Sequence, residues 1–176
     1  MGKTKILFIY HQIPNKIKGD VLYPLNEIKK IYPEIYRQGI EKYKNRKKIM
    51  KSKILPLDCL WNDALHFNPI DPRLIKKSLA KFGYKFSGEF FRIHWEKLDP
   101  KITTIYKNTS PRRIFKKDFE DYNLENLVKY KKIPATTMKY YEKLIKQGKK
   151  PLIYSRIPHI FYRGSMNIKN TPIIKV

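Results

Sequence analysis

The expected fold depends most on residues 151–176, whose sequence is PLIYSRIPHIFYRGSMNIKNTPIIKV. Two short apolar runs, 152–154 and 160–162, flank the dipeptide Pro158-His159, and a third run, 173–176, closes the stretch. Short apolar runs separated by Pro, Gly and Asn are typical of strands joined by turns. We therefore expect three strands here, with His159 where the middle one begins.

Two other histidines stand in a similar context. His11 closes the apolar run 7–10, and His66 follows Ala64-Leu65. We predict that these runs are neighbouring strands that bring His11, His66 and His159 into one cleft as candidate catalytic residues. Taken singly, each histidine also fits a structural role. His94 alternates with apolar residues in 88–96 and is expected to face solvent.

Composition indicates a single α+β domain that spans residues 1–176. A chain of 176 residues that is 41% hydrophobic can bury a substantial core. Cys59 is the one cysteine, so no intrachain disulfide can form and a reducing compartment is favoured. No stretch reaches the roughly 18 apolar residues of a membrane span, and no secretion signal is recognisable. We expect a cytoplasmic protein without a membrane partner.

The formal net charge of +24 suggests nucleic acid as a partner, because Lys and Arg attract phosphate backbones. Only eight of the 39 basic residues are Arg, the better phosphate ligand, so the charge also fits an ordinary Lys-rich surface. Cations in 42–53 equally suit the solvated end of a helix. The candidate contacts to nucleic acid are Lys44, Arg46, Lys47, Lys48, Arg112, Arg113, Lys116 and Lys117.

Several common sites are absent from the sequence. It contains no Walker loop, GxGxxG, HExxH or GxSxG motif, and no pair of cysteines for zinc. The three histidines offer no short-range pair of metal ligands, so we expect no metal.

Helices are predicted at 23–32, from Pro33 to about residue 50, at 72–82 with Asp71 as N-cap, and from Thr136 or Thr137 to residue 147. Residues 54–60 are expected to be extended, and 102–106 to form a strand. Segment 118–132 is only weakly helical in pattern.

Four blocks carry a resemblance to a known group. They are Tyr10-His11, Leu65-His66-Phe67-Asn68, Leu98-Asp99-Pro100 and Pro158-His159-Ile160-Phe161-Tyr162. Together they resemble a family of small bacterial proteins in the ADP-ribosyltransferase-like superfamily, which also includes the tRNA 2′-phosphotransferases. The likeness covers about half of the chain in scattered blocks. A helical insertion at about 23–53 and a variable segment at about 107–132 look like additions.

The resemblance implies a split, strongly bent mixed β-sheet around a cleft for NAD or an ADP-ribose-like group. By analogy, His11 contacts a ribose hydroxyl or the nicotinamide amide, and His66 and His159 line the same cleft. A packed turn is the structural alternative for residues 61–63. The other expected ligand contacts are Tyr10, Trp61, Asn62, Asp63, Asn68, Tyr162 and Arg163.

One departure from the superfamily affects the expected chemistry. The transferases use a late Glu to stabilise an oxocarbenium-like transition state, and His159 occupies the matching position here. The nearest upstream acid, Glu142, falls on a predicted helix. Binding or transfer of a phosphate therefore fits better than glycosyl transfer from NAD.

We expect a nucleotide-binding transferase, with NAD or an ADP-ribose-like ligand, that acts on a cytosolic macromolecule such as nucleic acid. One alternative is a basic nucleic-acid-binding protein without catalysis. Another is a metal-independent ribonuclease in which two histidines serve as general acid and base.

Overall fold

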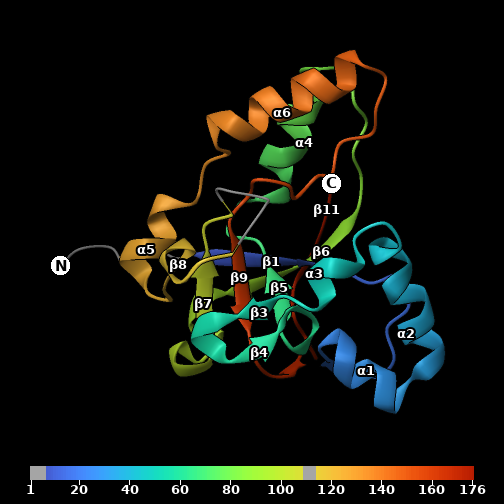
Figure 1. Cartoon of the computed structure of the whole chain (residues 1–176), viewed down its shortest axis with the longest axis vertical. Coiled ribbons are helices and arrows are strands. Elements are labelled where there is room, and N and C mark those ends of the chain that lie inside the picture. The colour runs from blue at the N-terminus through green and yellow to red at the C-terminus, as the bar shows by residue number, and fades with distance from the viewer. Residues whose placement is uncertain (1–6, 109–113) are drawn as a thin grey trace.

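Two antiparallel sheets form the centre of the chain in the computed structural model, which describes residues 7–108 and 114–176 (Figure 1). The predicted contacts Arg112 and Arg113 lie outside the described residues. The first sheet has the order β1 (Phe8–Gln12), β6 (Glu89–His94), β11 (Ile173–Lys175). The second has the order β5 (Leu65–Phe67), β9 (His159–Tyr162), β7 (Thr103–Tyr106), β8 (Phe119–Asp121).

The two sheets meet at an isolated antiparallel bridge between Tyr10 and Asn68. The Tyr10 N–H donates to the Asn68 carbonyl at 2.9 Å, and the Asn68 N–H donates to the Tyr10 carbonyl at 2.7 Å. Every strand pairing among the described residues is antiparallel, so the expectation of a mixed sheet is wrong. Parallel strands must be joined by crossover connections, which usually contain a helix packed on the sheet. Here the two longest helices pack on each other in a separate layer instead.

That helical layer consists of α4 (Pro72–Ala80) and α6 (Ala135–Lys146), which lie side by side at the top of Figure 1. Their contact is a separate apolar cluster that includes Leu79 and Tyr141. The predicted N-cap of α4 is confirmed, because the Asp71 side chain accepts from the Arg73 N–H. The predicted Thr cap of α6 is wrong. Pro134 holds the cap position, and the Thr137 hydroxyl donates to the Arg156 carbonyl at 2.7 Å.

Residues 25–50, which we call the arm, lie beside the sheets at the right of Figure 1. The arm contains α1 (Leu25–Ile31), α2 (Pro33–Ile40), the 3₁₀ turn η1 (Glu41–Tyr43) and α3 (Lys47–Met50). The predicted helix from Pro33 to about residue 50 is wrong, because α2 ends at Ile40. Tyr43 turns inward and is buried in the core, and the charged residues that follow offer no apolar stripe to extend the helix.

Short elements complete the described chain. β2 (Val21–Leu22) pairs with β10 (Met166–Asn167), and β3 (Lys53–Ile54) pairs with β4 (Cys59–Leu60). The hairpin β3–β4 replaces the extended segment expected at 54–60. The remaining elements are α5 (Leu124–Lys129) and the 3₁₀ turns η2 (Leu55–Leu57), η3 (Trp61–Asp63), η4 (Trp95–Lys97), η5 (Pro100–Ile102) and η6 (Lys116–Asp118).

The strand expected at 152–154 is also wrong, because these residues form no strand. Ile153 and Tyr154 pack against the helical layer, and the Tyr141 hydroxyl donates to the Ile153 carbonyl. These contacts hold the segment against α6 and away from the edges of the sheets.

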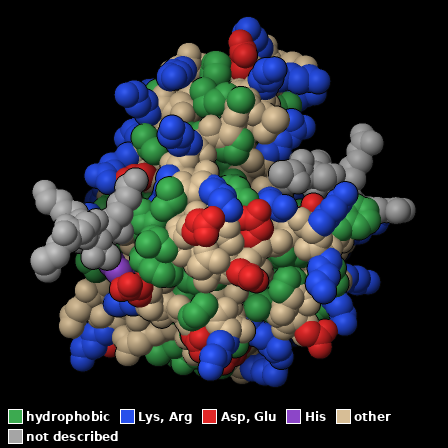
Figure 2. All heavy atoms as spheres, turned by 90° about the vertical axis from the view of Figure 1, so that its left-hand side faces the viewer, with side chains coloured by type: hydrophobic (Ala, Val, Ile, Leu, Met, Phe, Trp, Pro, Cys, Tyr) green, Lys and Arg blue, Asp and Glu red, His purple; other side chains and the backbone are tan. Residues whose placement is uncertain are grey.

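Positive charge is spread over the surface. Figure 2 shows Lys and Arg side chains scattered across one face, with acidic side chains interspersed near its centre. None of the helices formed by the described residues has the length and apolar character to cross a membrane.

Candidate functional site

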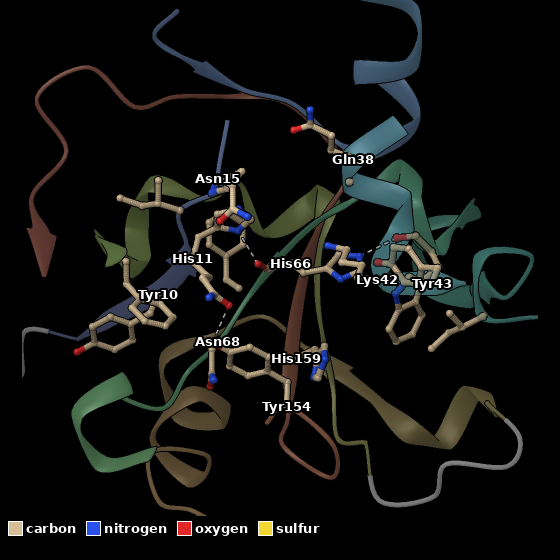
Figure 3. Close-up of a pocket in the computed structure, with 18 of the residues that line it drawn as sticks. Tyr10, His11, Asn15, Gln38, Lys42, Tyr43, His66, Asn68, Tyr154 and His159 are labelled. Carbon is tan, nitrogen blue, oxygen red and sulfur yellow. Dashed lines mark hydrogen bonds between the residues drawn. The ribbon is translucent and has the colours of Figure 1, made fainter. Parts of the chain in front are cut away.

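A pocket of about 480 Å³ opens between the strands and the arm (Figure 3). His11 from β1, His66 from β5 and His159 from β9 all line it. In β5, the alternation of side chains buries Leu65 and Phe67 in one core cluster and leaves His66 on the opposite face. The structure thus brings together the three histidines that the sequence proposed as one set.

Each imidazole is fixed by a backbone carbonyl. His11 Nδ1 lies 2.7 Å from the His66 carbonyl, His66 Nε2 lies 2.7 Å from the Trp61 carbonyl, and His159 Nδ1 lies 2.7 Å from the Ile157 carbonyl. A carbonyl can only accept, so each of these ring nitrogens carries the proton. The other nitrogen of each neutral ring is left as a hydrogen-bond acceptor.

The protein environment keeps the rings neutral. Burial lowers the pKa of His11 to about 4 and that of His66 to about 3, although both rings retain some contact with the solvent of the pocket. The Lys42 ammonium contributes to both shifts. Burial also lowers the pKa of His159. At neutral pH the pocket therefore presents three uncharged imidazoles.

Trp61 and Phe161 pack against the rings of His66 and His159. Trp61 and Phe161 meet His66 edge to face, with ring centroids 5.3 Å and 4.9 Å away. His159 lies 6.4 Å from His66 between ring centroids. Phe161 is fully buried and pairs with His66 across β5 and β9. The histidine positions are thus set by the packed core and by strand register together.

The arm supplies the wall across from Tyr10 and Asn68, where Figure 3 shows Lys42 and Tyr43. Tyr43 is buried and accepts a hydrogen bond from the Trp61 indole, which ties the arm to η3. Lys42 and Arg46 are the cations that the arm contributes to the lining, and Lys16 adds a third from the segment after β1. Gln38 from α2 lies above them in the same view.

Asn68 adds a second kind of polar group. Its Oδ1 accepts from the Ile70 N–H at 2.8 Å, which assigns the other atom of the amide as Nδ2. This Nδ2 is buried and has no hydrogen-bond partner among the described residues. A buried donor without a partner is costly, so a ligand with an acceptor there would be stabilised.

Only some of the remaining predicted ligand contacts lie in the pocket. Tyr10 and Trp61 line the pocket, whereas Asn62, Asp63, Tyr162 and Arg163 do not. Asp63 accepts from Asn26 at 2.7 Å and from the Leu60 N–H at 2.8 Å, as the packed-turn alternative for 61–63 expects. Tyr162 packs against the core on the other side of β9. Arg163 donates to the Leu57 carbonyl at 2.8 Å.

Of the predicted nucleic-acid contacts that the structure describes, one lines the pocket and the others lie on the surface outside it. Arg46 lines the pocket, while Lys44, Lys47 and Lys48 are exposed on the arm outside the lining. Lys116 and Lys117 are exposed on η6.

Sequence reasoning missed several lining residues, among them Gln12, Asn15, Gln38 and Tyr154. Tyr154 donates to Gln12 Oε1 at 3.3 Å across the pocket. Gln12 directly follows His11 and Asn15 lies four residues after it, which is a usable local signal. No local pattern marks Gln38 or Tyr154, because their positions depend on how the arm and residues 152–154 pack.

The pocket lining combines neutral polar side chains with Lys and Arg. Among the described residues, no Asp or Glu lines the pocket, and no group of three or more His, Cys, Asp and Glu is placed to hold a metal. Burial raises the pKa of the Cys59 thiol to about 11, so at neutral pH it is not a thiolate nucleophile. The expected upstream acid, Glu142, pairs with Lys146 on α6 at 2.8 Å.

Comparisons of the chain with protein-family models, with curated proteins and with solved structures found no match.

Proposed function

We propose that the chain is a transferase of ADP-ribosyltransferase-like fold that binds NAD or an ADP-ribose-like nucleotide in this pocket. One observation carries the proposal. Three neutral imidazoles from three neighbouring strands converge on a single pocket of about 480 Å³. Pockets of roughly 300–1,000 Å³ suit ligands of nucleotide size.

The polar groups of the lining match the groups of a nucleotide. The acceptor nitrogens of His11, His66 and His159 suit ribose hydroxyls, which can donate to them. The unpartnered Asn68 Nδ2 can donate to a ring nitrogen or a carbonyl of a base or nicotinamide. Tyr154 offers an aromatic face on which a planar ring can stack.

The same lining favours one kind of transfer over another. Cleavage of the nicotinamide–ribose bond develops positive charge that a carboxylate would stabilise, and the described lining contains none. Attack of an acceptor hydroxyl on a phosphorus atom of the ligand forms one P–O bond and breaks the P–O bond to the departing half of the pyrophosphate. The charge that develops is negative, so this transfer needs no such carboxylate. An imidazole with a free nitrogen, such as His159, can take the proton of the attacking hydroxyl. The proposed acceptor is a cytosolic macromolecule.

The ribonuclease alternative fits less well. It requires one histidine to be protonated near the working pH and to act as general acid. Burial lowers the pKa of all three pocket histidines, which leaves no imidazolium at neutral pH.

Nucleic-acid binding without catalysis remains a second candidate, because a specific observation favours it. Lys44, Lys47 and Lys48 are exposed together on the arm, in a chain of net charge +24. Such binding would depend strongly on salt and would not need the pocket.

A thermal-shift experiment tests the proposal and uses a matched control. The melting temperature is measured with NAD, ADP-ribose, AMP and a short RNA, for the native chain, His11→Ala and His94→Ala. His94 lies on β6 outside the pocket, and its Nδ1 is 3.5 Å from Glu96 Oε2. Nucleotide bound only to the folded state raises the melting temperature, by mass action. We expect stabilisation by NAD or ADP-ribose in the native chain and His94→Ala, and none in His11→Ala.

Two outcomes would contradict the proposal. Stabilisation by RNA alone, unchanged in His11→Ala and lost in high salt, would favour the second candidate. Nucleotide stabilisation of equal size in all three proteins would place the ligand outside the histidine pocket.

A further inference from the structure

Lys42 and Arg46 form a pair of cations on the arm side of the pocket. Arg46 Nη2 donates to the backbone carbonyl of Lys42 at 3.0 Å, which holds the Arg46 side chain back over η1. Both cations lie over the ring of Tyr43, at 5.2 Å and 5.8 Å from its centroid. Because Tyr43 is buried against Trp61, it is a fixed platform for both charges.

This pair lacks a counter-charge. Within residues 7–108 and 114–176, neither Lys42 nor Arg46 forms an ion pair with a carboxylate. Two like charges four residues apart repel each other. Elsewhere, Arg73 is paired with Asp71 and Lys53 with Asp58. An unpaired double charge that is concentrated in a concave site is a place where an anion would be stabilised.

The surroundings of Lys42 distinguish it from ordinary surface lysines. Its side chain reaches the solvent of the pocket, yet enough protein surrounds the ammonium for burial, and next the charge of Arg46, to lower its pKa. The same ammonium helps to lower the pKa of His11 and His66. The positive potential of the arm therefore extends across the pocket to the histidines.

We propose that Lys42 and Arg46 form the subsite for the phosphate or pyrophosphate group of the ligand. This assignment rests on the proposed function in so far as the ligand is a nucleotide. The planar Arg46 guanidinium can bind two phosphate oxygens at once, and Lys42 adds a point charge beside it. The phosphates then face the arm, and the ribose hydroxyls face His11, His66 and His159.

The assignment gives the arm a role in ligand selection. The helices α1, α2 and α3 bury no residue fully, so they add little to the core. Through Lys42 of η1 and Arg46, which precedes α3, the arm would make the pocket prefer phosphorylated ligands over the corresponding nucleosides.

Calorimetric titration of the full chain tests the subsite with three probes, which are ADP-ribose, adenosine and inorganic pyrophosphate. The proteins are the native chain, Lys42→Gln, Arg46→Gln and the matched control Lys44→Gln. Lys44 is exposed between the other two and does not line the pocket. All three side chains are exposed, so the variants are expected to fold, and circular dichroism checks this.

We expect Lys42→Gln and Arg46→Gln each to weaken binding of ADP-ribose and of pyrophosphate by about tenfold or more, the usual effect of losing a charged hydrogen bond. Adenosine affinity should be unchanged in every variant. Lys44→Gln should bind all three probes within about twofold of the native chain.

The outcomes separate this inference from the proposed function. Binding of ADP-ribose that none of the substitutions weakens would overturn the subsite and leave the nucleotide site standing. Binding of pyrophosphate that depends on Lys42 and Arg46, without any binding of ADP-ribose, would support the anion subsite and contradict the proposed ligand. Equal losses in Lys44→Gln and Lys42→Gln would overturn the subsite, because they indicate a diffuse charge effect. Absence of binding by all probes would overturn both proposals.

Discussion

The two walls of the pocket are built in opposite ways. The strand wall holds His11, His66 and His159, and each ring is fixed by a backbone carbonyl and surrounded by protein. The arm wall holds Lys42 and Arg46, whose exposed side chains rest on a single buried ring, Tyr43. Fixed neutral groups suit recognition of shape and hydroxyl position. Long cationic side chains suit an anion whose position is set by charge.

The support beneath the walls differs as well. Phe161 under the strand wall is fully buried among Trp61, His66 and Tyr106. On the arm, Tyr43 alone is buried in the same apolar cluster, and Ile49 is only partly buried at its edge. The strand wall should therefore depend on global stability, whereas the arm should be able to open locally.

The largest expected difference between the walls is in core packing. Phe161→Ala should lower the free energy of unfolding by about 3–5 kcal/mol, because it removes a fully buried ring and leaves a cavity. Ile49→Ala on the arm should cost about 1–2 kcal/mol, since the side chain is only partly buried. Urea unfolding followed by circular dichroism measures both. Equal costs would show that the arm is as much a part of the core as β9.

The second expected difference is in pH dependence. The folded state lowers the pKa of His11 from an ordinary value near 6.5 to about 4. Between these values the unfolded chain binds the extra proton, so acidification favours unfolding. The stabilisation is fully present above pH 6.5 and falls by up to about 1.4 kcal/mol per pH unit as the pH drops toward 4.

Urea unfolding at a series of pH values between 7 and 4 measures this slope. His11→Gln should reduce the slope, because glutamine does not titrate. Gln38→Ala, at a position of the pocket lining that does not titrate, serves as the control and should leave it unchanged. A slope that is the same in all three proteins would show that the His11 ring is not held neutral by the fold.

The smallest expected effect concerns the attachment of the arm. Asn26 Nδ2 donates to Asp63 Oδ1 at 2.7 Å and joins α1 to η3. Asn26→Ala should cost only about 1 kcal/mol of global stability, but it should speed amide hydrogen exchange within residues 25–50. Asn45→Ala, at an exposed arm position, is the matched control. Faster exchange in β5 and β9 as well would contradict an arm that opens by itself.

Local pattern predicted much of the strand wall. The short apolar run before His66 and the Pro158-His159 start of β9 placed His66 and His159 on strands, and β5 and β9 are paired in the structure. The cap by Asp71 and the end of α6 before Gly148 were also readable, because they depend on nearby backbone groups. Glycine at 148 has a φ of +68°, which few other residues adopt readily.

Local pattern failed where burial of a single distant side chain decided the outcome. The helix from Pro33 breaks after Ile40 because Tyr43 is drawn into the core beside Trp61. Residues 152–154 are apolar enough for a strand, yet Ile153 and Tyr154 find their partners in the layer of α4 and α6. Neither contact has a signal within its own segment.

The sequence by itself determined which residues carry polar chemistry and on which short strands His11, His66 and His159 lie. Those features follow from short apolar runs and from the turn residues between them, both of which are local. Only the tertiary structure decided that Tyr10 of β1 bridges Asn68 just after β5 and that Lys42 and Arg46 line the same pocket as the histidines. It also decided that Asn68 Nδ2 has no hydrogen-bond partner within residues 7–108 and 114–176. These features depend on packing between segments far apart in the chain, and such packing is fixed by the shape of the whole core.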